Sequence, residues 1–150
     1  AELTETITVD RPPAEVWEVL AAFERIAEWA PHVAHSSLTT DRADGVGAAR
    51  RVQVGRNALL EEVTEWAPRT RLAYVINGLP PVVRSAVNTW RLEPSGKGTD
   101  VSLTSRIDAG RRPPQRLVAR IIGRALAKAS REMLSGLQHH LDHELERSEQ

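Results

Sequence analysis

Residues 48–63 read AARRVQVGRNALLEEV, and their alternation of apolar and polar side chains decides how the surrounding chain folds. Gly55 stands at the first central position of a two-residue turn, which suits a type II′ β-hairpin. This turn fixes the register of the two strands. It places Val54 opposite Asn57, Val52 opposite Leu59, Arg50 opposite Glu61 and Ala48 opposite Val63. Because side chains alternate between the two faces of a sheet, one otherwise apolar face carries a facing arginine–glutamate pair.

Arg50 and Glu61 are therefore charged residues at positions where the pattern calls for apolar ones. A lone buried charge costs several kcal/mol or more, so such groups must be paired or open to a wet cavity. Two interpretations follow, and they overlap. The residues form a cross-strand ion pair that satisfies itself, or they face a cavity and contact a ligand.

The composition describes one ordinary globular domain spanning residues 1–150. Twenty basic and twenty acidic residues give zero net charge, which argues against non-specific nucleic-acid binding. The chain has no cysteine, which excludes disulfides and thiolate chemistry and fits a reducing cytoplasm. Residues 1–10 alternate polar and apolar side chains, unlike a signal peptide, and no run reaches the ~20 apolar residues of a membrane span. We predict a cytoplasmic protein without a membrane span or a nucleic-acid partner.

Turn residues divide the rest of the chain into a strand, two short helices, six strands and one long helix. Pro12 and Pro13 lie where proline is tolerated at a helix start. The predicted elements are a strand at Thr4–Val9, a helix containing Val16, Trp17 and Leu20, a short helix at Phe23–Trp29, strands at Ala34–Asp41, Gly47–Val54, Ala58–Trp66, Leu72–Asn77, Val83–Leu92 and Thr99–Ile107, and a helix from Pro113 to about Glu146. The order predicts an α+β fold in which a curved, seven-stranded antiparallel sheet is covered by the long helix.

The long helix has two sides on a helical wheel. One carries an apolar cluster, and an i, i+4 stripe of cations lies away from it. The cluster is Val118, Ile121, Ile122, Ala125, Ala129 and Met133, and the cations are Arg116, Arg120, Arg124 and Lys128. Past Ser135-Gly136 the apolar stripe shifts to Leu134, Leu137, Leu141 and Leu145, which predicts a helix that bends or wraps its partner, with the bend at Gly136. With one Phe, one Tyr and one Met in the chain, sheet and helix cannot fill the space between them, so we expect a cavity.

An ordered set of short motifs resembles the START-like, or Bet v 1-like (SRPBCC), helix-grip superfamily, and within it the polyketide cyclase/dehydrase type. The motifs are Ile7-Thr8-Val9, Pro13-Ala14-Glu15-Val16-Trp17, Trp29-Ala30-Pro31-His32, Gly45-Val46-Gly47-Ala48-Ala49-Arg50, Glu61 before Val63-Thr64-Glu65-Trp66, Leu72-Ala73-Tyr74, and Trp90-Arg91-Leu92-Glu93-Pro94. The resemblance implies a helix-grip fold and a deep cavity under the long helix for a small apolar or aromatic molecule. Members include aromatase/cyclases and carriers of quinones or lipids, so the fold alone does not decide the reaction.

Strand parity assigns the face that should line this cavity. We interpret Arg50, Glu61 and Tyr74 as candidate catalytic residues, because such groups can polarise a ketone or take an acidic proton. The candidate ligand-binding residues are Trp29, His32, Val52, Leu59, Val63, Ile76, Asn88, Trp90, Leu103, Ile122, Ala125, Ala129 and Met133. We predict binding of a polyketide-, lipid- or quinone-like molecule. The alternatives are a polyketide cyclase/dehydrase, and an interaction module that uses the basic helix face.

Three histidines near the end of the long helix, His139, His140 and His143, do not complete a zinc site. Only His139 and His143 share one helix face, and the sequence places no Glu or third His beside them to complete a site. A solvated helix face therefore explains their spacing better. We therefore predict no metal site and no cofactor. The sequence leaves the oligomeric state open, a homodimer included.

Overall fold

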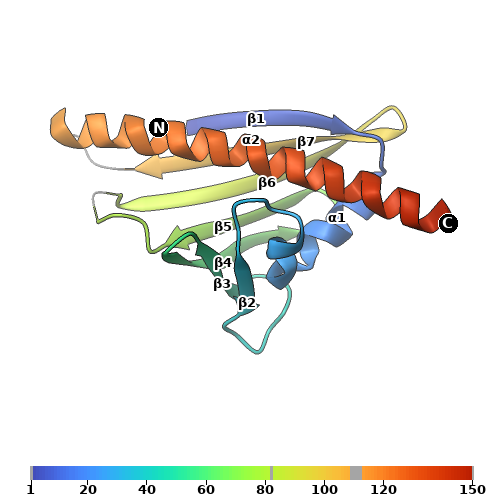
Figure 1. Ribbon diagram of the computed structural model, residues 1–150, viewed down its shortest axis with the longest axis horizontal. Helices are drawn as coiled ribbons and strands as arrows, with labels where there is room; N and C mark the ends of the chain where they lie inside the picture. The colour runs from blue at the N-terminus through green and yellow to red at the C-terminus, as the bar shows by residue number, and fades with distance from the viewer. Residues whose placement is uncertain (1, 82, 109–112, 150) are drawn as a thin grey trace.

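The computed structural model describes residues 2–81, 83–108 and 113–149. They form one curved antiparallel sheet, two short helices and a long C-terminal helix (Figure 1). The elements are β1 (Glu2–Val9), α1 (Pro13–Ala21), η1 (Phe23–Glu28), β2 (His35–Leu38), β3 (Ala49–Val54), β4 (Asn57–Ala67), β5 (Arg71–Asn77), β6 (Ser85–Ser95), β7 (Gly98–Asp108) and α2 (Pro113–Glu149). The predicted element order and fold class are confirmed, and the largest differences in strand bounds are at β2, which is shorter than expected, and at β6, which begins and ends later than expected.

The seven strands lie in the order β1-β7-β6-β5-β4-β3-β2, and all six neighbouring pairs are antiparallel. The β3–β4 hairpin has the register derived from its turn, with Arg50 opposite Glu61. Gly55 adopts φ +59°, the left-handed conformation that a type II′ turn requires and that glycine adopts without strain. One glycine therefore sets which side chains of β3 and β4 face the interior.

The two short helices close one end of the interior. Helix α1 begins at Pro13, where the missing N–H leaves no intrahelical bond unmade, and it buries Val16, Trp17 and Leu20. The second short helix, η1, is a 3-10 helix that buries Phe23 and Ile26. Both connect β1 to the opposite edge strand β2, so they lie across the concave side of the sheet.

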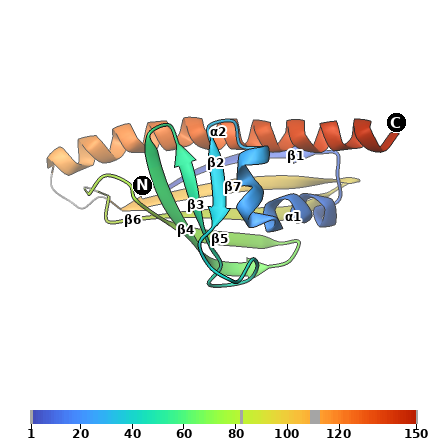
Figure 2. The ribbon, with the colours of Figure 1, turned by 60° about the horizontal axis from the view of Figure 1, so that its bottom comes forward.

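Helix α2 runs along the sheet as one continuous, nearly straight rod and packs on β1 and β7 (Figure 2). Its buried side is formed by Ser130, Met133, Leu134, Leu137 and Leu141, with Gly123 close to β1. Of the apolar cluster predicted on the helix, Met133 is buried and Ile122 and Ala129 are partly buried, whereas Ile121 and Ala125 are exposed. In the first half of α2 the position beside β1 is occupied by a small residue, Gly123. The side chain of Val118 lies outside the described part.

Gly136 is a site of close packing, and the predicted bend there is wrong. A Cβ atom at this position would overlap the carbonyl oxygen of Trp29 and lie 2.7 Å from Pro31 Cδ. The helix therefore touches the backbone after η1, and glycine is required because any side chain would separate the two segments. Among the described residues, no helix combines the length and the hydropathy needed to cross a lipid bilayer.

Candidate functional site

Arg50 is buried, with 2% of its surface exposed, and all three guanidinium nitrogens are engaged. Its Nε and Nη2 each lie 2.8 Å from Oε1 of Glu61, and Nη1 donates to the carbonyl oxygen of Phe23 at 2.7 Å. The guanidinium carbon lies 3.7 Å from the centroid of the Phe23 ring and 4.8 Å from that of Tyr74. Charge pairing and cation–π contacts together offset the cost of burying this cation.

Tyr74 joins this ion pair to a chain of buried polar groups. Its hydroxyl oxygen accepts hydrogen bonds from Trp90 Nε1 at 3.3 Å and from Asn88 Nδ2 at 3.4 Å. The Ser105 hydroxyl donates to Asn88 Oδ1 at 2.7 Å, and its oxygen lies 3.4 Å from that of Ser130 on α2. Burial raises the pKa of Tyr74, the nearby Glu61 carboxylate raises it further, and Arg50 and the two donors oppose the rise. The phenol is therefore protonated at neutral pH.

The three candidate catalytic residues thus lie together but contact one another and the protein. None of them lines any of four pockets formed by the described residues, which are the three described below and a polar one on the face of β1, β5, β6 and β7 that carries Thr4, Thr89 and Thr104. Their geometry corresponds to the first of the two interpretations of Arg50 and Glu61, an ion pair that satisfies itself.

An apolar pocket of about 550 Å³ lies between the first half of α2, the end of the β3–β4 hairpin and the β5–β6 loop. We call it the α2 pocket. Its wall is formed by His32, Val54, Asn57, Leu59, Gly78, Leu79, Pro80, Pro81, Ile122, Ala125, Leu126 and Ala129. Size and lining are those of a small-molecule site, in which burial supplies affinity and a few polar groups set orientation.

Five of the candidate ligand-binding residues line the α2 pocket: His32, Leu59, Ile122, Ala125 and Ala129. Seven others are packed in the hydrophobic core or its polar chain and line none of the four pockets: Val52, Val63, Ile76, Asn88, Trp90, Leu103 and Met133. Trp29 is also buried, with its ring 5.7 Å from that of Trp90 in an edge-to-face arrangement. It borders different pockets, described below.

Sequence reasoning missed the β5–β6 loop as part of the site. Leu79, Pro80 and Pro81 lie in the turn between two predicted strands, and Leu126 is not part of the apolar cluster predicted on the long helix, yet all four line the α2 pocket. An apolar residue followed by two prolines between strands is a weak signal for a rigid hydrophobic wall, because proline restricts the backbone without requiring hydrogen bonds from it.

His32 is the titratable side chain of the α2 pocket. Its Nδ1 is buried and has no hydrogen-bond partner among the described residues. Burial lowers the pKa of His32, while Glu132 and Glu61 oppose this effect. The neutral ring best carries its proton on Nε2, because a buried N–H without an acceptor costs more than an unpaired lone pair. Nε2–H can then donate to an oxygen of a bound molecule.

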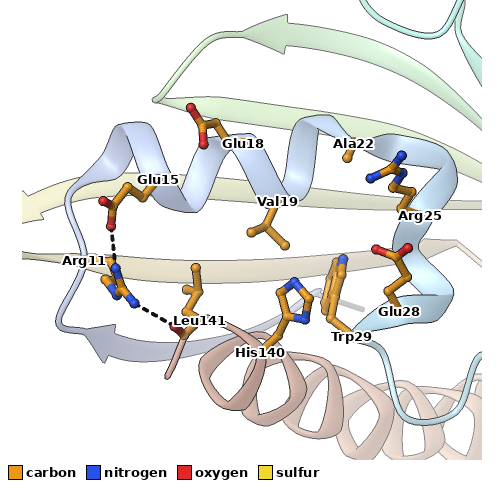
Figure 3. A pocket seen from close by; sticks show the side chains of 10 residues that line it. All are labelled: Arg11, Glu15, Glu18, Val19, Ala22, Arg25, Glu28, Trp29, His140 and Leu141. Atoms are coloured by element: carbon orange, nitrogen blue, oxygen red, sulfur yellow. Dashed lines mark hydrogen bonds and ion pairs between the residues drawn. The ribbon is translucent and has the colours of Figure 1, made fainter. Parts of the chain in front are cut away.

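A second pocket, of about 340 Å³, lies between α1, η1 and the last third of α2 (Figure 3). Its wall is charged, and Arg11 lies at one end of it, where it donates to Glu15 Oε2 at 3.0 Å and to the carbonyl oxygen of Leu141 at 2.9 Å. The Trp29 ring forms one side. Glu18, Arg25 and Glu28 also line it, so this charged pocket offers an apolar molecule much less than the α2 pocket does.

A third pocket beside Gly136 is bordered by Glu28 and the three histidines of α2. The rings of His139 and His143 lie 4.8 Å apart, as expected one turn apart on a helix. Within the described part of the chain, no three histidine, cysteine or acidic side chains come together in a way that could hold a metal ion.

Comparison with protein families matches residues 1–142 to the family described as "Polyketide cyclase / dehydrase and lipid transport". Comparison with curated proteins gives no match.

Solved structures show the same fold. The Zhui aromatase/cyclase from a Streptomyces species matches with a TM-score of 0.81 and 19% identity, covering 97% of this chain and 95% of that one. The di-domain ARO/CYC BexL matches with a TM-score of 0.78 and 23% identity, over 95% of this chain and 46% of that one. A START superfamily protein from Mycobacterium smegmatis matches with a TM-score of 0.73 and 12% identity, over 95% and 97%. At these identities the likeness concerns the fold alone.

Proposed function

Because the chain belongs to the polyketide cyclase / dehydrase and lipid transport family, we propose that it binds a small hydrophobic or aromatic molecule in the α2 pocket. The observation that carries this proposal is the apolar wall shared by Leu59, Leu79, Ile122 and Leu126, with His32 and Asn57 as its polar side chains. The buried polar side chains of Arg50, Glu61, Tyr74, Asn88 and Ser105 are bonded within the protein, whereas this wall faces open space.

The pocket chemistry favours a ligand with an apolar body and one oxygen. Burial of the body against aliphatic side chains contributes about 25 cal/mol per Å² of apolar surface, part of which offsets the loss of freedom on binding. The oxygen can accept a hydrogen bond from His32. Polyketide-, lipid- and quinone-like molecules all have this character.

The experiment is a titration with the fluorescent apolar probe 1-anilinonaphthalene-8-sulfonate, combined with native mass spectrometry of the purified protein. We expect one saturable site or a co-purified ligand. Ala129→Trp should fill the α2 pocket and abolish saturable binding. The control, Ser135→Trp, places the same side chain on α2 beside the third pocket and should leave binding intact. Absence of any saturable site, or equal loss in both variants, contradicts the proposal.

Catalysis of an aldol-type cyclisation and dehydration is the second candidate, supported by the family and by the aromatase/cyclase names of two structural neighbours. Arg50, Glu61 and Tyr74 are its proposed catalytic groups, although their present contacts serve the fold. Such a role requires that Glu61→Gln abolish turnover of a poly-β-ketone thioester while leaving probe binding in the α2 pocket intact. Equal loss of turnover and of folded protein assigns these residues to the structure instead.

A further inference from the structure

Positive charge is concentrated on one segment of this chain. Residues 109–131 contain seven basic residues and no acidic one, although the whole chain is neutral. The segment includes the first half of α2, whose first turn carries no acidic side chain. Cations near a helix N-terminus oppose the helix dipole. The helix dipole therefore does not favour this arrangement of cations.

Two large aliphatic side chains stand among these cations. Leu117 and Ile121 are each 61% exposed, although both are of the kind that α2 buries further along. Positions 117, 121, 124 and 128 follow each other at intervals of three or four, so they share one face of the helix with the exposed Arg124 and Lys128, and Arg120 borders it. We call this surface the α2 basic face.

The three cations of this face are available for an external partner. Arg120, Arg124 and Lys128 take part in none of the ion pairs formed by the described residues. Arg131, the next cation along the helix, differs because it lies 3.3 Å from Glu5 of β1. The chain thus pairs the cation beside the sheet and leaves those further out unpaired.

We propose that the α2 basic face docks on an anionic lipid surface, with Leu117 and Ile121 entering the headgroup region and Arg120, Arg124 and Lys128 contacting phosphates. A helix with one aliphatic strip bordered by cations has the chemistry of an interfacial helix. An acidic protein partner fits less well. Protein interfaces are held by aromatic anchors in shaped pockets, and this face has aliphatic tips and long flexible cations instead.

The α2 basic face lies near the α2 pocket, which suggests a function for docking. Ile122, Ala125, Leu126 and Ala129 lie on the same half of α2 and line the α2 pocket. Docking through Leu117 and Ile121 therefore brings the half of α2 that lines the pocket close to the bilayer, which shortens the path of a hydrophobic molecule between the two. Docking itself does not depend on the pocket being occupied.

Co-sedimentation with vesicles tests the proposal. One set is pure phosphatidylcholine and the other contains roughly 30% phosphatidylglycerol. We expect binding to the anionic vesicles that weakens as salt is raised, with at least about tenfold weaker binding to the neutral ones. Leu117→Ser/Ile121→Ser and Arg120→Glu/Arg124→Glu should each reduce binding to the anionic vesicles by about tenfold or more.

The matched control is Arg51→Glu/Arg91→Glu, which makes the same charge change at two exposed strand residues away from α2. It should bind anionic vesicles nearly as well as the unmodified chain. Thermal unfolding and probe binding verify that each variant keeps its fold and its pocket, so failure of docking is distinguished from failure of the proposed ligand site. No binding to anionic vesicles, equal loss in the control, or binding that survives the serine variants overturns the proposal.

Discussion

Arg50 and Glu61 face each other from β3 and β4, and the guanidinium contacts a single carboxylate oxygen through two nitrogens, each 2.8 Å away. Both side chains are almost completely buried. Removing one partner leaves the other charge without compensation in a medium that solvates it poorly. Removing both leaves a cavity but no uncompensated charge.

Arg50→Ala should therefore destabilise the protein by about 3–5 kcal/mol, measured by urea denaturation. The matched control is Arg71→Ala, which breaks the Arg71–Glu65 pair between β4 and β5 at the same 2.8 Å but at a partly exposed site. That change should cost less than about 1 kcal/mol. Similar losses in the two variants would show that burial does not determine the strength of the Arg50–Glu61 pair.

Replacement by alanine should change the stability of the protein in opposite directions at the two glycines of α2. Gly136→Ala brings a Cβ into the Trp29 carbonyl oxygen, and we expect it to destabilise the protein by about 1–3 kcal/mol. At Gly123 the nearest atom is Leu3 Cδ1 at 3.8 Å, an ordinary contact. Gly123→Ala should stabilise by up to about 1 kcal/mol through helix propensity. The melting temperatures of both variants test this prediction. A shift of the same sign in both would contradict the difference in packing between Gly136 and Gly123.

Tyr74 can be titrated without interference because the chain contains a single tyrosine. The pKa of this phenol is raised mainly by burial, so the folded protein keeps its proton above pH 10, where the unfolded chain loses it. The unfolded state then binds fewer protons, and stability falls as pH rises through this range. Absorbance at 295 nm should show ionisation together with loss of the circular dichroism signal. Reversible ionisation near pH 10 in a protein that stays folded would contradict the burial of this residue.

His32 should make the protein less stable in acid. Since burial lowers its pKa below about 6.5, the unfolded chain binds more protons than the folded one just below that pH. Stability therefore falls as pH drops through the unfolded value and levels off below the folded one. Denaturation at a series of pH values should show a smaller acid loss in His32→Leu. The control is His35→Leu, which changes an exposed histidine of β2. Because this variant keeps His32, the contribution of His32 to the acid loss should remain. An unchanged acid loss in His32→Leu would contradict the assignment.

The β3–β4 hairpin could be predicted from the sequence because a local feature, the turn, determines which residues of the two strands face each other. Gly55 determined the turn, the turn determined the register, and the register placed Arg50 opposite Glu61. The sequence could not show that the Phe23 ring and carbonyl group cover the guanidinium, because η1 reaches β3 only through the tertiary fold. The alternation of residues in the sequence is the same whether Arg50 and Glu61 only bind each other or face a cavity.

The long helix shows a second limit. The wheel places Ile121 in the same apolar cluster as Ile122 and Ala129. In the structure Ile121 is exposed, while Ile122 and Ala129 line the α2 pocket. Periodicity reports that a helix is amphipathic, but not how near each turn lies to its neighbour.

Gly136 also fixes the rotation of α2 about its own axis. Ile122, Ala129 and Gly136 are spaced by seven residues, so they lie on one line along the helix. Aliphatic contacts are non-directional and would tolerate several azimuths. The close contact between Gly136 and the Trp29 carbonyl allows only one rotation of the helix, because turning the helix would bring the side chain of Ser135 or Leu137 against that backbone. A contact in the second half of the helix thereby keeps Ala129, about two turns away, and Ile122, about four turns away, directed toward the α2 pocket, and keeps Lys128 out of it.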